Sequence, residues 1–543
     1  MGQGPELKRL SRRTLLATAA ATLGLAGCAP REVPPPPAAW IGARHERGHR
    51  LRDLASAPTW PAEATPRRAA VLIVGAGIAG LAAARAFARA GVDDVHVLEL
   101  EDQAGGNSRS HVLGGLACPL GAHYLPLPTP ESHEVAEWLH ELGLLRHELG
   151  RTVADERHLC HSPQERLFIE GAWAEGLLPP AEPGSATAAQ YQRFAQAVAQ
   201  AQRLGSKVGR RAFAQPAHRS AWTPELAALD GQAFSTWLAH QGLNDAHLRW
   251  YLDYCCRDDY GAGLEAVSAW AGIHYFASRH GFQAPGEGAA EAERDAVFTW
   301  PEGNAWLAQR MAAPLQGRLH TGRTVLRVEE QRQGVRLLAW DESAQRAELW
   351  VANTVVLAAP LFIAARVLAN PPEALRQAAT LLQHAPWLVA NVHIDAPLVD
   401  RPGAPPSWDN VVYGQRGLGY VDASHQSLRP HVGATVLTAY HALTQAERPQ
   451  LLAEDPAPWR ERVLQDLHAA HPDIHQRVQR VDLMRWGHAM AIPRPGVQRH
   501  PALAALRAAR GRVRFAHADL AGCSVFEEAF AAGCEVAGPA PRT

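Results

Sequence analysis

The sequence lacks an excess of charge of either sign. Its 543 residues carry 53 Lys and Arg against 54 Asp and Glu, which gives a formal net charge of −1. A nucleic-acid-binding surface needs a basic excess, so we expect no nucleic-acid partner. With 47% hydrophobic residues, the chain is of a globular class and long enough for roughly two or three domains sharing large cores.

The sequence also lacks cysteines at metal-ligating spacing. None of the seven cysteines forms a C-x-x-C pair, and the adjacent pair Cys255–Cys256 is typical of core residues. Three histidines recur between residues 468 and 475, but Pro472 interrupts the helix that would align them. We therefore expect no metal site.

Beyond the N-terminal region there is no run of about 18 apolar residues, the length that a membrane-spanning helix needs. Residues 1–28 combine basic residues with a short alanine-rich stretch, which is typical of a signal peptide. Within them, SRRTLL (11–16) resembles a twin-arginine export signal, with an ordinary secretory signal as the alternative. LAGC resembles a lipobox that would lipidate Cys28. These features predict a bacterial cell-envelope protein on the periplasmic side, held to the membrane by a lipid anchor only; residues 29–66 form a proline-rich tether and N-terminal segment.

A glycine-rich turn follows an apolar run at residues 71–80, VLIVGAGIAG. The run predicts a buried parallel strand. Gly75 permits the tight turn, Gly77 lets a phosphate approach the backbone, and Gly80 lets the following helix pack against the strand. The free N–H groups at Ile78 and Ala79, at the start of this helix, predict a site for a pyrophosphate.

An acidic residue, Glu99, follows the second predicted strand at 95–98. A carboxylate at this distance from the glycine turn accepts hydrogen bonds from the hydroxyls of an adenosine ribose, and it favours a ribose without a 2′-phosphate. The glycine spacing alone is a weak signal. Together with the strand, the helix and the acid, it predicts a dinucleotide-binding domain.

From Glu99 onward the sequence resembles the flavin-containing amine oxidase superfamily. This superfamily includes monoamine and polyamine oxidases, protoporphyrinogen oxidases and carotenoid desaturases. The residues that match its motifs in this region are Glu99, Gly105, Gly106, Gly121, Ala122 and His123. Asn107 stands where the family usually has Arg, so the resemblance implies that nearby Arg109 contacts the diphosphate.

Further segments of the resemblance follow in the family's order and extend it over residues 68–537. Val325 lies in the expected adenine-flanking strand at 324–330, and TVVLAAP at 354–360 looks like the strand that returns to the nucleotide domain. Near the C-terminus, Asp519 matches the acid that binds the ribityl chain. The helix beginning near Val525 would direct its N-terminus at the flavin pyrimidine. The resemblance implies FAD as cofactor.

The implied fold class is α/β (α+β), with a Rossmann-like FAD-binding domain interleaved with a substrate domain of mixed sheet and helices. We expect the FAD-binding domain at residues 67–140, 295–375 and 480–543, and the substrate domain at residues 141–294 and 376–479. Within the substrate domain, hydrophobic patterning predicts helices at 186–204 and 234–243 and strands at 387–395, 410–414 and 433–443.

The implied activity is oxidation of an amine by hydride transfer to flavin N5. Trp486 is expected to form a wall of the aromatic cage, with Tyr420 and Tyr413 as candidates for the opposite wall. His488 could act as a base, orient the substrate or tether the flavin. The pair Asp258–Asp259 could attract a cationic polyamine, although neighbouring acids are also common on a solvated helix face.

The largest departure from the family is the near absence of lysine. The family has a lysine that binds a water near the flavin, expected near residues 389–391, but Lys8 and Lys207 are the only lysines in the chain. The electron acceptor therefore stays open between O₂ and a quinone or redox protein. Two other functions also stay open: a desaturase-like or protoporphyrinogen-oxidase-like enzyme acting on a hydrophobic molecule, and a flavin-binding envelope subunit without turnover.

Overall fold

The computed structural model describes residues 34–53, 60, 65–205, 209–279, 281–284, 296–427 and 433–538. The predicted signal, including Cys28, lies outside the described residues. From Ala38 onward the chain forms one compact unit. Among the described helices, none is long and apolar enough to cross a membrane.

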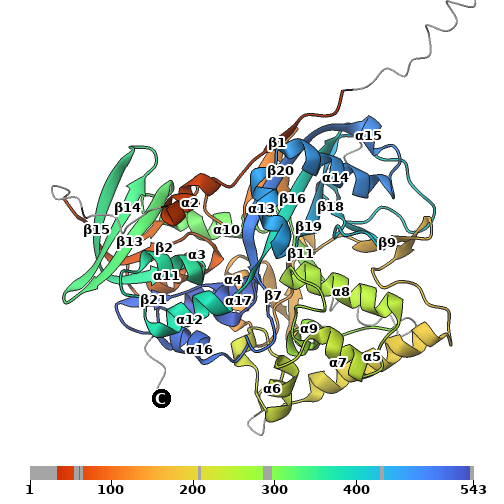
Figure 1. Ribbon diagram of the computed structural model, residues 1–543, viewed down its shortest axis with the longest axis horizontal. Helices are drawn as coiled ribbons and strands as arrows, with labels where there is room; N and C mark the ends of the chain where they lie inside the picture. The colour runs from red at the N-terminus through yellow and green to blue at the C-terminus, as the bar shows by residue number, and fades with distance from the viewer. Residues whose placement is uncertain are drawn as a thin grey trace, which may run out of the picture. The chain divides into compact units, whose positions relative to one another are not determined.

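A seven-stranded sheet is built around the predicted nucleotide-binding strand, β2 (Arg67–Val74) (Figure 1). Parallel pairing joins β2 to β3 (Val95–Leu98) and to β15 (Arg346–Leu357). The parallel part ends at β12 (Leu319–His320) and β21 (Val513–Phe515), and the antiparallel strands β14 (Gly334–Asp341) and β13 (Arg323–Gln331) extend the sheet beyond β15.

Helices cover both faces of this sheet, which explains why the core of β2 is continuously apolar. Ile73 packs into the cluster formed with α3 (Ile78–Arg89) and α17 (Phe526–Glu535). Its neighbour Leu72 points the other way and packs with residues of three other helices, because successive strand side chains alternate between faces. Those helices are α11 (Leu361–Val367), α12 (Glu373–Leu381) and α16 (Pro501–Ala508).

An eight-stranded sheet forms the second layer system. Its order is β1 (Ala38–Trp40), β20 (Val478–Ala491), β16 (His384–Ile394), β19 (Thr435–Ala442), β18 (Tyr420–Asp422), β17 (Asp409–Val412), β9 (Glu165–Ile169) and β10 (Ala172–Glu175). The β1–β20 and β17–β9 pairs are parallel and the other pairs are antiparallel.

The two faces of this second sheet pack against different helices. One face packs on α14 (Pro456–His468). The other faces a cluster of helices that includes α5 (Ala186–Arg203), α6 (Pro224–Asp230), α7 (Phe234–His240), α8 (Ala246–Tyr260) and α9 (Ala269–Ala277) (Figure 1). Because strand side chains alternate, neighbouring residues of a strand point to opposite faces: in β16, Leu388 packs with α14 and Val389 packs with the helical cluster.

The remaining elements are short. They include α4 (His133–Glu141) and the antiparallel pairs β4 (Ser110–Leu113) with β5 (Leu116–Pro119), β6 (Tyr124–Pro126) with β11 (Val297–Thr299), and β7 (Leu145–Glu148) with β8 (Arg151–Ala154). A further helix, α10 (Ala305–Ala312), packs on the α3 side of the seven-stranded sheet.

The structure confirms the α/β fold class and the predicted helices and strands at their expected positions. Two strands of the eight-stranded sheet come from outside the range predicted for the substrate domain. β1 belongs to the N-terminal segment, and most of β20 falls in the range assigned to the FAD-binding domain. The exact domain boundaries stay a prediction.

Candidate active site

A cavity of about 430 Å³ is lined by residues of both sheets. It extends from the carboxyl ends of β2 and β3, where ligands bind in open α/β sheets, to β16 and β19 of the second sheet. Most of the residues predicted from sequence line it: Gly75, Gly77, Ile78, Ala79, Glu99, Gly105, Gly106, Gly121, Ala122, His123, Val325, Trp486, His488, Asp519 and Val525.

The glycine turn has the shape of an anion cradle. A Cβ at Gly80 would lie 1.9 Å from the carbonyl oxygen of Gly75, so only glycine allows α3 to sit this close to β2. A Cβ at Gly77 would meet only Gly106 Cα, at 3.8 Å, which leaves space on the cavity side. No side chain caps the N-terminus of α3, so its first N–H groups are available to an anion.

The carboxylate of Glu99 is held by backbone groups. Glu99 Oε2 accepts a hydrogen bond of 2.7 Å from the N–H of Ala76, and Oε1 accepts one of 2.9 Å from the N–H of Glu101. Burial raises the pKa of Glu99, and these two hydrogen bonds oppose the rise. Each oxygen keeps acceptor capacity for a ribose hydroxyl.

Asp519 is held in place in a similar way, but by one backbone N–H and two histidine side chains from different segments. Its Oδ2 accepts a hydrogen bond of 2.8 Å from the N–H of Leu361, while His384 Nε2 lies 3.0 Å and His517 Nδ1 lies 3.2 Å from Oδ1. Complete burial by itself would raise the pKa of Asp519, but His517 and His384 lower it well below its usual value. Asp519 therefore lines the cavity as a carboxylate.

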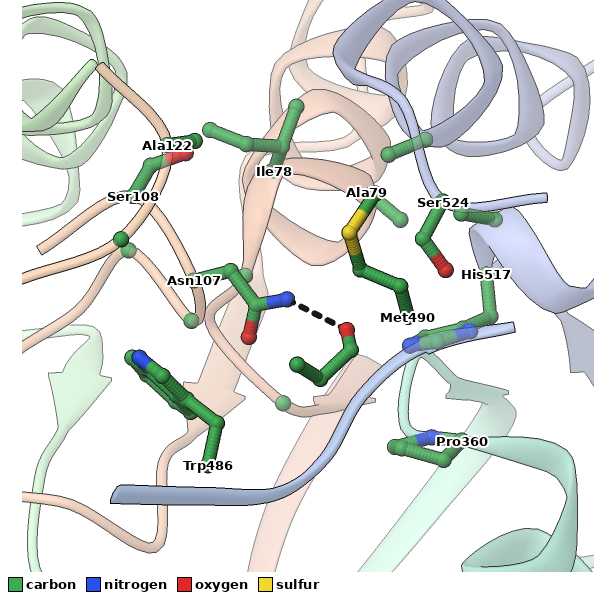
Figure 2. Close-up of a pocket in the computed structure, with 18 of the residues that line it drawn as sticks. Ile78, Ala79, Asn107, Ser108, Ala122, Pro360, Trp486, Met490, His517 and Ser524 are labelled. Carbon is green, nitrogen blue, oxygen red and sulfur yellow. Dashed lines mark hydrogen bonds between the residues drawn. The ribbon is translucent and has the colours of Figure 1, made fainter. Parts of the chain in front are cut away.

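Arg109, which the sequence predicted to reach a diphosphate, does not line the cavity. Its Nε donates a 3.0 Å hydrogen bond to the carbonyl of Gly106, and its guanidinium lies over the ring of Trp486. It supports the glycine turn from behind. Asn107 lines the cavity instead and donates a 2.7 Å hydrogen bond from Nδ2 to the carbonyl of Ala489, across the space shown in Figure 2.

Aromatic rings form the wall at the other end of the cavity. The ring of His123 stacks on Tyr440 at 4.4 Å between centroids, and Tyr440 donates a 3.1 Å hydrogen bond to the carbonyl of Gly121. Burial lowers the pKa of His123 to about 4, so this ring is neutral at pH 7. Trp387 and Trp486 also line this end.

Tyr420 is not part of this wall, which corrects the prediction from sequence. Its hydroxyl lies 2.7 Å from Nε2 of His471, on the face of the sheet that packs against α14. Tyr413 also lies away from the cavity, with its ring 4.6 Å from that of Trp250. Tyr440 of β19 lines the cavity instead, but the apolar pattern of 433–443 could not reveal which face of the strand does so.

Acidic side chains gather beside the aromatic wall. Asp258, Asp259 and Glu527 line the cavity. Asp259 forms an ion pair of 3.2 Å with Arg279. Among the residues that the structure describes, no cationic group lies within ion-pairing distance of Asp258 or Glu527. Sequence reasoning did not find Glu527 or Arg279, because nothing along the chain connects them with α8.

Burial and the neighbouring Asp259 raise the pKa of Asp258 to about 7. Burial likewise raises the pKa of Glu527, with Arg279 opposing the rise. Arg279 also opposes the rise for Asp258, but neither carboxyl forms an ion pair among the described residues. A cation in the cavity would therefore further stabilise their ionised forms.

His488 and Val389 complete the lining. Burial and the positive charge of Arg448 lower the pKa of His488 to about 4, and its ring lies 4.9 Å from that of Phe362. Val389 occupies the region where the family resemblance implied a lysine. In the part of the chain that the structure describes, no cluster of three or more histidines, cysteines and acids could hold a metal ion.

The profile of the family described as flavin-containing amine oxidoreductase matches residues 78–538. The chain belongs to this family. It is therefore an FAD-dependent oxidoreductase of the amine oxidase type, as the sequence predicted. A search of curated protein sequences gives no match.

Solved structures with the same fold include wild-type putrescine oxidase bound to putrescine, at 19% identity and a TM-score of 0.64, covering 87% of this chain and 99% of that one. Cyclohexylamine oxidase from Brevibacterium oxydans IH-35A matches at 18% identity with a TM-score of 0.62, over 86% and 98% of the two chains. A fatty acid isomerase from P. acnes matches at 16% identity with a TM-score of 0.58, over 86% and 97%. At these identities, the likeness shows the fold alone.

The residues present fit an extended FAD. The open space at Gly77 and the uncapped N-terminus of α3 suit the diphosphate. Glu99 at one end suits the adenosine ribose and Asp519 suits the ribityl hydroxyls. The N-terminus of α17, also without a side-chain cap, lies at the cavity beside Val525, as expected for the flavin end.

Proposed function

We propose that this enzyme oxidises an amine that carries a second positive charge, such as a diamine or polyamine. The observation that carries the proposal is the acidic end of the cavity, where Asp258 and Glu527 face the substrate space without an ion-pair partner among the described residues. Asp258 is half-buried and Glu527 is buried, and a carboxylate withdrawn from water is costly unless a cation joins it. The putrescine-bound neighbour supports a dicationic ligand for this fold.

The bound flavin would supply the two-electron acceptor. The chain's own residues would position the substrate. The stacked rings of His123 and Tyr440, with Trp387, enclose the amine that reacts and exclude water from it. Asp258 holds the distant ammonium group. A monoamine of similar length lacks this second contact, so it leaves the acid uncompensated.

The pKa of Asp258, about 7, sets the expected pH dependence of binding. Its carboxyl is mostly protonated below pH 7 and mostly ionised above it. Affinity for a dication should therefore rise as the pH increases through 7. Affinity for a neutral or singly charged apolar ligand should not change with the ionisation of Asp258.

Anaerobic reduction of the purified holoenzyme tests the proposal. We expect putrescine or spermidine to bleach the visible flavin band at a much lower concentration than butylamine, a monoamine of the same carbon length as putrescine. Equal bleaching by both would remove the second-charge requirement. Bleaching by apolar molecules alone would favour the hydrophobic-substrate alternative, and no bleaching by any substrate would favour a flavin-binding subunit without turnover.

The electron acceptor is a separate part of the proposal. With Val389 lining the cavity and no lysine after Lys207, we infer that a quinone or redox protein accepts the electrons more readily than O₂ does. Admitting air to the substrate-reduced enzyme, in parallel with a soluble quinone, measures the two reoxidation rates directly. Faster reoxidation by air would contradict this inference.

We further propose export by the twin-arginine route and lipid attachment at Cys28, on the strength of residues 1–28. Export and lipid attachment each depend on a short motif, and substitutions within that motif test them. Cys28→Ser should release the protein from the membrane fraction, and Arg12→Lys combined with Arg13→Lys should leave it in the cytoplasm. Membrane attachment that persists in Cys28→Ser would exclude the lipid anchor.

A further inference from the structure

A helix that precedes the family-matched region forms part of the cavity wall. The family match begins at residue 78, but Gly48 and Leu51 of α2 (His45–Asp53) line the same cavity as Glu99 and Val325. Leu51 is only 5% exposed and belongs to the apolar core on this side of the seven-stranded sheet. The helix therefore packs against the end of the cavity that Glu99 marks as the nucleotide end.

The chain reaches this position from the second sheet. β1 pairs with β20, and Ile41 continues the pairing by donating a 2.9 Å hydrogen bond to the carbonyl of Leu483. Gly42 then turns with φ = 82°, at a point where a Cβ would lie 2.5 Å from the sulfur of Met484. We call residues 38–53 the N-terminal latch, because they join the edge of the substrate sheet to the nucleotide end of the cavity.

One set of contacts fastens the latch to the chain just after Glu99. Arg47 Nη1 donates a 2.8 Å hydrogen bond to the carbonyl of Leu100 and forms a 2.8 Å ion pair with Asp102. The N–H of Arg44 donates to the carboxylate of Glu101 at 3.1 Å. These partners follow the residue that would bind the ribose.

A second set fastens the latch on the other side of the nucleotide end. Arg50 forms a 3.1 Å ion pair with Glu342, in the turn between β14 and β15. Arg366 of α11 donates from Nε to the carbonyl of Leu51 at 3.1 Å and from Nη2 to that of Arg52 at 2.9 Å. Carbonyls in the last turn of a helix have no partner inside the helix, so Arg366 secures the end of α2. In Figure 1, α2 lies beside the strands of the β13–β15 meander.

We propose that the N-terminal latch closes over the nucleotide end of the FAD site and must open before FAD enters or leaves. Its fastenings are hydrogen bonds and ion pairs at the protein surface, and each is worth little alone. Leu51 supplies the apolar burial. A short helix held in this way can open locally without unfolding the domain, so the latch controls the rates of exchange in both directions.

The test measures FAD exchange in the purified full-length protein and not its turnover. Arg47→Ala removes both the contact with Leu100 and the ion pair with Asp102. We expect it to speed up both FAD release and FAD uptake by the apoprotein by roughly tenfold, the effect of about 1.4 kcal/mol. The rise in flavin fluorescence measures release, and its fall measures uptake. The equilibrium affinity should change less than either rate, because opening assists both directions.

Arg52→Ala is the matched control. Arg52 lies on the same helix, with a side chain that is 64% exposed and that pairs, among the described residues, with its neighbour Asp53 alone, so its removal should leave both rates unchanged. Asp102→Asn breaks the Arg47 ion pair from the other side, at an exposed position, and should accelerate both rates even if Arg47→Ala fails to fold. Unchanged rates in Asp102→Asn and in folded Arg47→Ala, or faster release with unaltered uptake, would overturn the proposal.

Discussion

The two ends of the cavity are built in different ways. The nucleotide end uses backbone groups and glycines close in sequence: Gly75 and Gly77 form one turn, Gly80 lies in the first turn of α3, and Glu99 comes directly after β3. The substrate end uses side chains from α8, β16, β19, β20 and α17, together with His123. A local motif thus defines the first end, whereas packing alone defines the second.

This contrast has an energetic counterpart. At the nucleotide end, Glu99 is held by N–H groups of its own segment. At the substrate end, the half-buried Asp258 and the buried Glu527 form no ion pair among the described residues, although Arg279 opposes the rise in the pKa of both. The carboxylate at the first end has its hydrogen bonds before any ligand binds, while those at the second end would gain an ion-pair partner when a cation binds. Mutations should therefore affect folding and cofactor binding at one end and substrate choice at the other.

The largest expected effect is that of Gly80→Ala at the nucleotide end. The added Cβ would lie 1.9 Å from the carbonyl oxygen of Gly75, so α3 must move away from β2. We expect a loss of about 3 kcal/mol or more in the free energy of unfolding, together with loss of flavin.

Gly77→Ala is the control, since its Cβ meets nothing closer than 3.8 Å. It should melt within a few degrees of the parent as apoprotein while binding FAD more weakly. Thermal unfolding of the apoproteins and flavin content report the two effects. Equal melting temperatures for both variants would contradict this account of the glycine turn.

Asp258→Asn should have the next largest effect, and at the substrate end alone. Removing one partner of a buried charge pair typically costs about 2–5 kcal/mol. We therefore expect the KM for putrescine to rise by at least tenfold, with little change in the KM for butylamine. The increase in putrescine affinity as the pH rises through 7 should disappear in the variant. Steady-state kinetics from pH 6 to 8 measure both effects, and a preserved pH dependence would assign it to another group.

His384→Phe tests a connection between the two ends, because His384 lies on a strand of the substrate sheet but contacts Asp519 of the cofactor site. The variant loses one hydrogen bond to a buried carboxylate, and we expect FAD affinity to fall roughly tenfold. His384→Gln keeps a donor and should restore most of the affinity. Titration of the apoproteins with FAD distinguishes them; equal affinities in the Phe variant and the parent would show that Asp519 needs no such support.

The smallest effect is expected for Tyr420→Phe. Its hydroxyl contacts His471 on the α14 side of the sheet, so the variant should lose about 1 kcal/mol of stability and keep the parent's KM for putrescine. A changed KM would restore Tyr420 as a candidate for the cage wall. Chemical denaturation and amine kinetics on the same preparation give both values.

The sequence predicted much of the nucleotide end and the outline of the fold. The strand, the glycine turn, the helix and Glu99 follow from local patterns, and the acid of the closing segment, Asp519, was found by resemblance. Predictions for single side chains were weaker. Arg109 turned away from the cavity because Gly106 and Trp486 engage it, and Tyr420 fell on the wrong face of its strand.

The local sequence was enough to predict that the cofactor is a dinucleotide, because neighbouring residues make the tight turn and the start of the helix that would bind it. Three features depend on contacts between residues far apart in the chain: Tyr440 and not Tyr420 lines the cavity, Asp258 and Glu527 line the same cavity, and α2 packs at the end that Glu99 marks. Such contacts arise from the twist and register of two packed sheets, and no pattern within a short segment contains that information.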